Sequence, residues 1–179
     1  MENENLTRIQ NVSGKFNALF SFLIICTPLS ILLFWLFFNS IPTSFKGELP
    51  VNTNDALPLL SLSLAFLVCM IPGSVTVYAL LTLKALFKLY ENAVVFSTAN
   101  VKCFRRLGYA LIIWVLAKMV STSLLSIVLS FNNPPGERQL VVQFGSTDIA
   151  TLVFGAIVLV ISWVMNEACK LNDEQAYTV

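Results

Sequence analysis

The chain has 179 residues, of which 56% are hydrophobic and 12% are charged, with a net charge of +1 and no histidine. Soluble domains carry about 25% charged residues, so this composition excludes an ordinary soluble fold, and the near-zero net charge by itself indicates no class of partner. The absence of histidine removes the commonest general base and the commonest metal ligand.

Four apolar runs dominate the chain and predict an integral membrane protein. A helix needs about 20 mostly apolar residues, at roughly 1.5 Å rise each, to cross the hydrocarbon layer. The predicted spans are residues 16–38, 58–83, 107–131 and 149–166. The polar segments between them are too short to bury cores of their own. We therefore expect one all-α membrane domain over residues 1–179, a bundle of four transmembrane helices.

A proline lies near the middle of each of the first two spans, Pro28 and Pro72. Proline removes one backbone hydrogen bond from a helix and leaves the carbonyl four residues earlier without its donor. The carbonyls of Ile24 and Val68 are therefore expected to need donors from neighbouring helices, since lipid offers none.

The connection between the second and third spans is predicted to be a helical hairpin over residues 84–106. Apolar residues recur at helical spacing beyond Leu83, so the second helix is expected to continue past the membrane. Ser97 or Thr98 can then cap a new helix that starts near Val101 and becomes the third span.

The outer loop 132–147 opens with Asn-Asn-Pro-Pro-Gly, which cannot continue a helix. Its segment Arg138–Phe144 has an apolar centre typical of a short strand. Ser146 or Thr147 can cap the fourth span, and Asp148 in the first turn suits the helix dipole.

Lysine and arginine gather on one side of the predicted spans. Only Lys46 and Arg138 lie in the loops of the other side. Because short loops rich in these residues stay in the cytoplasm, both termini and the 84–106 hairpin are expected there. The basic residues of that side are Arg8, Lys15, Lys84, Lys88, Lys102, Arg105, Arg106 and Lys170.

Lys118 is the only charged residue inside the four spans. A lysine near the bilayer centre costs about 2.5–3.5 kcal/mol on insertion scales and is expected to face the bundle interior or water. Asp148 and Glu167 lie at the two ends of the fourth span, so no carboxylate is expected at the depth of Lys118. Its surroundings are instead predicted to be neutral.

The candidate intramembrane polar site is Lys118 with Trp114, Ser121 and Thr122. Trp114 lies one turn back and can offer a ring face to the ammonium group, and the two hydroxyl residues lie one turn on. Three interpretations remain open. Lys118 bonds the carbonyls freed by the prolines and holds the bundle together, or it binds an anionic or carbonyl-bearing ligand or forms a gate, or its side chain snorkels towards the membrane surface.

Neither a cofactor nor catalysis is indicated by the sequence. Cys26 and Cys69 lie mid-span and are expected to be packed thiols, while Cys103 and Cys169 lie at the cytoplasmic border without the C-x-x-C spacing of a metal site. No Ser-His or Cys-His pair, no carboxylate pair and no glycine-rich phosphate loop occurs, so an enzyme is not expected.

Three short segments around the predicted hairpin carry a family resemblance. They are residues 86–91 (Leu-Phe-Lys-Leu-Tyr-Glu), Phe96-Ser97 and residues 105–109 (Arg-Arg-Leu-Gly-Tyr), and the acidic tail 173–179 is a fourth point of similarity. On these segments the chain resembles DUF2975, a bacterial family of membrane proteins of unknown function, from residue 15 to the end. It departs from the family pattern at Ala93, where a glycine is usual, and at Gln175-Ala176.

The resemblance implies a multi-pass protein of the bacterial inner membrane with four spans and no assigned activity. Members of the family often lie beside a small helix-turn-helix regulator, which suggests such a regulator as a partner. Anionic lipid at the basic inner face is the other expected partner. Self-association into a homo-oligomer stays open, and direct nucleic-acid binding is not expected.

The preferred interpretation is a regulatory or scaffold protein that docks a cytoplasmic partner through residues 84–109 and the C-terminal tail. The alternative is a small transporter, a channel or a lipid- or ligand-binding protein with Lys118 in its site. The candidate docking surface is made of Lys88, Glu91, Lys102, Arg105, Arg106 and Glu174.

Overall fold

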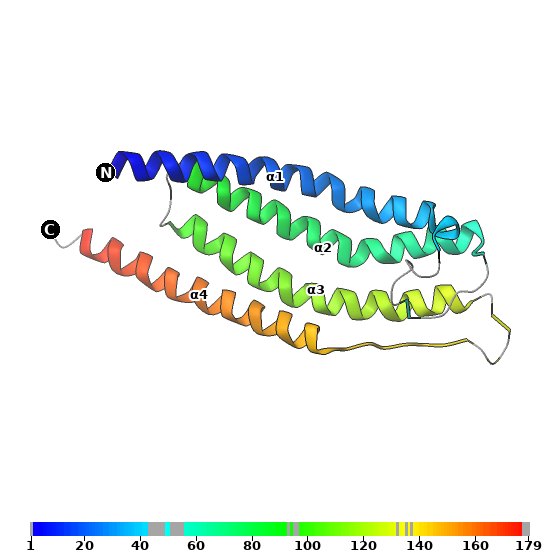
Figure 1. Ribbon diagram of the computed structural model, residues 1–179. Coiled ribbons are helices and arrows are strands. Elements are labelled where there is room, and N and C mark those ends of the chain that lie inside the picture. The colour runs from blue at the N-terminus through cyan, green and yellow to red at the C-terminus, as the bar shows by residue number, and fades with distance from the viewer. Residues whose placement is uncertain are drawn as a thin grey trace.

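The protein is built from long helices. The computed structural model covers the whole chain, and the structure describes residues 2–42, 49–50, 56–92, 94, 97–131, 133–134, 136 and 138–176, with side chains described from residue 13 to residue 171 of these. The helices are α1 (Glu2–Leu36), α2 (Leu59–Glu91), α3 (Thr98–Ser130) and α4 (Ser146–Ala176), with one turn of 3-10 helix, η1 (Phe38–Ser40), after α1 (Figure 1).

Each of the four long helices contains a window that is long and apolar enough to cross a membrane. These windows are Ser13–Leu36, Leu59–Glu91, Thr98–Ser130 and Ser146–Leu171. The predicted all-α membrane fold with four spans is therefore confirmed. In α1 and α2 the helix continues through Pro28 and Pro72 without ending.

The helices lie side by side in chain order as an open bundle (Figure 1). Within the described residues, extensive contacts join α1 to α2, α2 to α3 and α3 to α4, and no other pair of long helices is in comparable contact. The N-terminal end of α1, the C-terminal end of α4, and the ends of α2 and α3 that follow each other in the chain lie at one end of the bundle (Figure 1). We call this the basic end, because it carries Lys84, Lys88, Lys102, Arg105 and Arg106.

The α2–α3 connection has the predicted hairpin form. α2 continues to Glu91, and α3 begins at Thr98, three residues before the expected start. Ser97 is the N-cap, and its side-chain oxygen accepts a hydrogen bond from the backbone N–H of Asn100 at 3.3 Å. Five of the basic residues, on α2 and α3, are thus carried by two helices that end and begin within a few residues of each other.

α3 and α4 approach closely because two glycines face each other. A Cβ added at Gly108 would lie 2.7 Å from Leu159 Cγ and 3.1 Å from the carbonyl oxygen of Gly155. A Cβ added at Gly155 would lie 3.2 Å from the carbonyl oxygen of Gly108. Small residues at such a crossing let the backbones of membrane helices touch. About two turns past the crossing towards α4's C-terminal end, the Ser162 hydroxyl donates a 3.0 Å hydrogen bond to the carbonyl of Val101.

The strand expected at Arg138–Phe144 is not formed. Within the described residues the chain contains no strand, and residues 138–145 are extended but lack a partner strand. The extended segment runs alongside α3 instead (Figure 1). Ser126 Oγ accepts a 3.0 Å hydrogen bond from the N–H of Val141, and Ser130 Oγ accepts one of 3.3 Å from the N–H of Gln139. Helix hydroxyls therefore take the place of a neighbouring strand.

Candidate site at Lys118 and the α2–α3–α4 pocket

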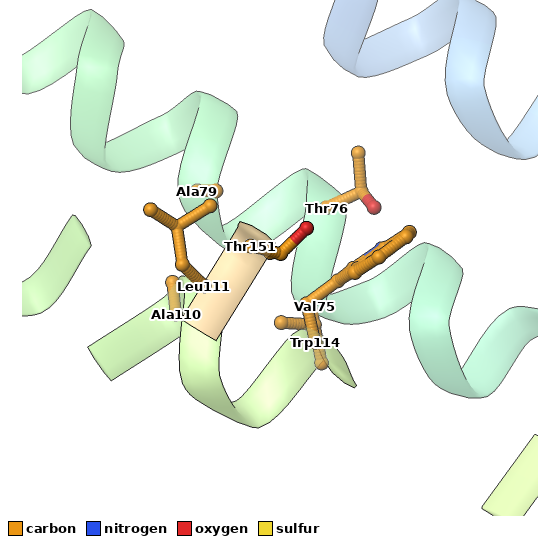
Figure 2. A pocket seen from close by; sticks show the side chains of 7 residues that line it. All are labelled: Val75, Thr76, Ala79, Ala110, Leu111, Trp114 and Thr151. Carbon is orange, nitrogen blue, oxygen red and sulfur yellow. The ribbon is translucent and has the colours of Figure 1, made fainter. Parts of the chain in front are cut away.

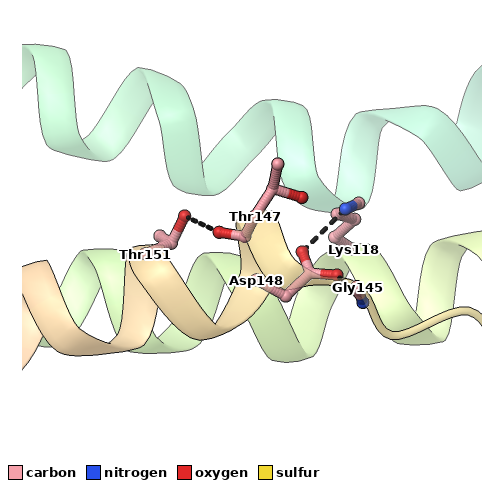
Figure 3. Close-up of polar contacts among 5 residues, drawn as sticks. All are labelled: Lys118, Gly145, Thr147, Asp148 and Thr151. Carbon is pink, nitrogen blue, oxygen red and sulfur yellow. Dashed lines mark hydrogen bonds and ion pairs between the residues drawn. The ribbon is translucent and has the colours of Figure 1, made fainter.

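Lys118 has a charged partner, and the expectation of neutral surroundings is wrong. Its ammonium nitrogen lies 2.7 Å from Asp148 Oδ1, in an ion pair that joins the middle of α3 to the first turn of α4 (Figure 3). Lys118 lies twelve residues along α3 from Arg106, which is about 18 Å at 1.5 Å per residue. The pair is therefore held well inside the apolar part of the bundle.

The reason for the error is the height at which α4 begins. Asp148 is predicted at the outer end of the fourth span, next to an outer loop formed by residues 132–147. The chain instead returns along α3 in extended form over residues 138–145 before α4 starts at Ser146. An extended residue covers about 3.3 Å against 1.5 Å in a helix, so this short segment reaches from the end of α3 down to Lys118.

The Asp148 carboxylate is fully enclosed and fully engaged. Its side chain is 1% exposed, against 32% for Lys118. Oδ1 accepts from the Lys118 ammonium group, and Oδ2 accepts a 2.9 Å hydrogen bond from the backbone N–H of Gly145 (Figure 3). The carboxylate also lies in the first turn of α4, where the helix dipole favours a negative charge. Three favourable interactions thus offset the cost of burying it.

The structure brings only some of the other predicted site residues into contact with Lys118. The Lys118 ammonium group lies 5.9 Å from the centroid of the Trp114 ring, so the expected cation–π contact is present. Ser121 is buried and donates a 3.1 Å hydrogen bond to the carbonyl of Val68, the group that Pro72 frees. The donor for that carbonyl is therefore a serine and not Lys118. Thr122 is partly buried and makes no hydrogen bond within the described part of the chain.

A pocket with a volume of about 380 Å³ lies next to Trp114, whose ring contacts Lys118. It is bounded by α2, α3 and α4 and lined by Val75, Thr76, Ala79, Ala110, Leu111, Trp114 and Thr151 (Figure 2). Trp114 connects the pocket to Lys118, and Thr151 lies on α4 one turn after the helix start that carries Asp148 (Figure 3).

The pocket is apolar in character even where its lining residues carry hydroxyl groups. Thr76 Oγ1 donates to the carbonyl of Pro72 at 3.0 Å, and Thr151 Oγ1 donates to the carbonyl of Thr147 at 2.8 Å. Both donors are therefore used within their own helices. The remaining polar features are the Trp114 indole N–H and, beyond it, Lys118. Such a pocket suits an apolar molecule with one acceptor group.

Five of the six predicted docking residues lie together at the basic end. Lys88 and Glu91 end α2, and Lys102, Arg105 and Arg106 begin α3; all five are exposed. Glu91 also accepts a 3.3 Å hydrogen bond from the side-chain amide of Asn17 on α1. Glu174 belongs to α4, and its side chain lies outside the described residues.

The described residues contain no group of three or more histidine, cysteine or carboxylate side chains that could hold a metal ion. All four cysteines are free thiols. Cys103 is buried and Cys169 is partly buried.

Asp148 is the site residue that sequence reasoning missed. Its place in the first turn of the fourth helix is as predicted, but its depth in the bundle, level with Lys118, is not. One signal was available: the fourth apolar run is the shortest of the four. A shorter span next to a longer one means that one end of the shorter helix begins below the membrane surface.

Comparison with known proteins assigns a family but no activity. The family model described as "Protein of unknown function (DUF2975)" matches residues 17–179, which is nearly the whole chain. No curated protein and no solved structure matches the chain. The four membrane-spanning helices and this match together show that the chain belongs to the DUF2975 family.

Proposed function

We propose that the protein binds an apolar ligand within the membrane, in the pocket between α2, α3 and α4. The observation that carries this proposal is the contact of Trp114 with both the pocket and Lys118. A charged residue inside a membrane span marks a functional site by default. This proposal is the ligand-binding alternative of the sequence analysis. An apolar pocket near Lys118 supports that alternative, whereas a solidly packed bundle would count against it.

The ligand class follows from the hydrogen-bond donors next to the pocket, which are the Trp114 indole and the Lys118 ammonium group. The Lys118 ammonium group has three donor protons, and its one ion-pair partner within the described residues is Asp148. With 32% of its side chain exposed, it keeps capacity for a second acceptor. The Trp114 ring gives a flat apolar wall. We therefore propose that the ligand of this pocket is an elongated apolar molecule that ends in a carbonyl or carboxylate group.

The test is the recovery of a small molecule with the purified protein. The full chain is extracted from native membranes in mild detergent, and bound small molecules are identified by mass spectrometry. Ala79→Leu fills the pocket without touching the ion pair, and Ala85→Leu is the matched control, because Ala85 is exposed on the same helix. We expect a stoichiometric ligand with the unchanged protein and with Ala85→Leu, and its loss with Ala79→Leu. Equal recovery from both variants would place the ligand elsewhere and end the proposal.

A second candidate function is the docking of a soluble partner at the basic end. It is favoured by the exposed charges Lys88, Lys102 and Arg106 on the ends of α2 and α3, where Ser97 caps α3. In this proposal the basic end faces the cytoplasm of a bacterial inner membrane, as the distribution of lysine and arginine indicates. The partner is a small helix-turn-helix regulator, and the protein acts as a regulatory scaffold.

Charge reversal tests this second function. Lys88→Glu with Arg106→Glu should abolish recovery of a soluble protein from the cell, whereas Arg138→Glu at the opposite end should leave recovery unchanged. Deletion of residues 171–179 should weaken recovery as well. If the double reversal and the deletion both leave partner recovery at its original level, the docking surface does not exist.

A further inference from the structure

A smaller pocket lies between α3 and α4 at the basic end, away from the site at Lys118. Its volume is about 210 Å³. It opens next to the Gly108–Gly155 crossing, and Leu159 borders both the crossing and the pocket. Its lining residues are Val101, Arg105, Tyr109, Leu159, Ser162, Trp163 and Asn166.

The pocket has an apolar floor and a rim of hydrogen-bond donors. Val101 is 4% exposed, and the Ser162 hydroxyl is already bonded to the Val101 carbonyl. The rim is formed by Arg105, Tyr109 and Trp163, which are exposed. Their guanidinium, phenol and indole groups all carry donors. No carboxylate lines the pocket.

Among the residues whose side chains the structure describes, Arg105 has no partner that would balance its charge. Within the described residues the guanidinium makes neither an ion pair nor a hydrogen bond. The carboxylate next to the pocket on α4, Glu167, is paired with Lys170 at 2.9 Å. Arg105 is thus an exposed cation at the mouth of the pocket, and none of the carboxylates in the described part of the chain pairs with it.

The position of the pocket identifies the kind of anion. Arg105 lies where the long apolar stretch of α3 meets the basic end. Tryptophan and tyrosine are enriched at this level of a membrane, because their rings lie at the headgroup layer. Basic pockets between transmembrane helices at such a boundary bind anionic lipid headgroups.

We propose that this pocket binds the headgroup of an anionic phospholipid. The Arg105 guanidinium donates to the phosphate oxygens, with the Trp163 indole N–H and the Tyr109 hydroxyl as further donors. An acyl chain follows the apolar groove past Leu159. This inference is independent of both proposed functions. It gives Arg105 a role that its neighbour Arg106, which does not line the pocket, lacks.

The experiment measures lipid binding to the purified full chain by native mass spectrometry in detergent. The probes are phosphatidylglycerol, phosphatidylcholine and inorganic phosphate. We compare the unchanged protein with Arg105→Gln and with Arg106→Gln, the matched control one residue away. Arg105→Lys keeps the charge but loses the planar fork that fits a phosphate. Helix content by circular dichroism shows that each variant is folded.

The expected result is selective binding of phosphatidylglycerol that Arg105→Gln weakens about tenfold, which corresponds to about 1.4 kcal/mol. Arg106→Gln should change the affinity less than twofold, with Arg105→Lys between the two. Equal weakening by Arg105→Gln and Arg106→Gln would overturn the proposal in favour of diffuse surface attraction. Binding of phosphatidylcholine as strong as that of phosphatidylglycerol would overturn it too. Inorganic phosphate that binds as tightly as the lipid would show a phosphate site instead of a lipid site.

Discussion

Replacement of Lys118 by methionine should destabilise the protein strongly, and more than replacement of Asp148 by asparagine. Lys118→Met leaves a carboxylate that is 1% exposed without its counter-ion. Breaking a buried ion pair in this way costs about 3–5 kcal/mol. Asp148→Asn removes the charge but keeps a side-chain oxygen that can accept from the Lys118 ammonium group or from the N–H of Gly145, and Lys118 itself is only partly buried, at 32% exposed. That change should cost about 1–3 kcal/mol.

The double variant Lys118→Met with Asp148→Asn separates the ion pair from other effects. Because it removes both charges, it should be less destabilised than Lys118→Met alone, with a coupling free energy of about 2 kcal/mol. The assay is reversible denaturant unfolding of the purified protein in detergent micelles, followed by circular dichroism. A cost below about 1 kcal/mol for Lys118→Met, or strict additivity in the double variant, would refute the claim that a dry, paired carboxylate holds α3 to α4.

Three further predictions concern the packing of the bundle, and each is checked by the same unfolding assay. Gly155→Leu should destabilise by about 3 kcal/mol, because any side chain there meets the Gly108 carbonyl oxygen at 3.2 Å, while Ala156→Leu on the exposed face should be neutral. An equal effect of both changes would argue against the crossing. Ser121→Ala should cost about 1–3 kcal/mol, since it leaves the Val68 carbonyl without a donor inside the apolar bundle, and Ser123→Ala, whose hydroxyl bonds its own helix, should cost less. Ser97→Ala should cost about 1 kcal/mol through loss of the N-cap of α3; no change would mean that the hairpin does not depend on this cap.

Much of the local structure could be predicted from residue patterns. Ser97 as the cap of α3 follows from a hydroxyl residue placed before a helical run, and this prediction is confirmed. The demand of the Val68 carbonyl for an outside donor follows from Pro72, and a donor is present. Both features depend on residues within a few positions of each other along one helix, where spacing alone carries the information.

The partners across helices could not be predicted in the same way. Ser121 as the donor to Val68, and Asp148 as the partner of Lys118, depend on which turn of one helix lies beside which turn of the next. The segment after α3 can return either as a helix or as an extended chain. The two paths place the first residue of the next helix at positions along the bundle that differ by many ångströms. The composition of the outer loop was compatible with both.

The amino-acid sequence by itself determined the class of the protein: four apolar stretches of spanning length, a helical hairpin between the second and third, and a concentration of eight lysine and arginine residues on one side of the spans. These features follow from hydrophobicity and local spacing, which act along the chain. Only the tertiary structure decided that Asp148 neutralises Lys118, that Gly108 meets Gly155, and that pockets flank Trp114 and Arg105. The physical reason is that charge pairing and close packing depend on the relative height of neighbouring helices, which is set by the path of the segment that joins them.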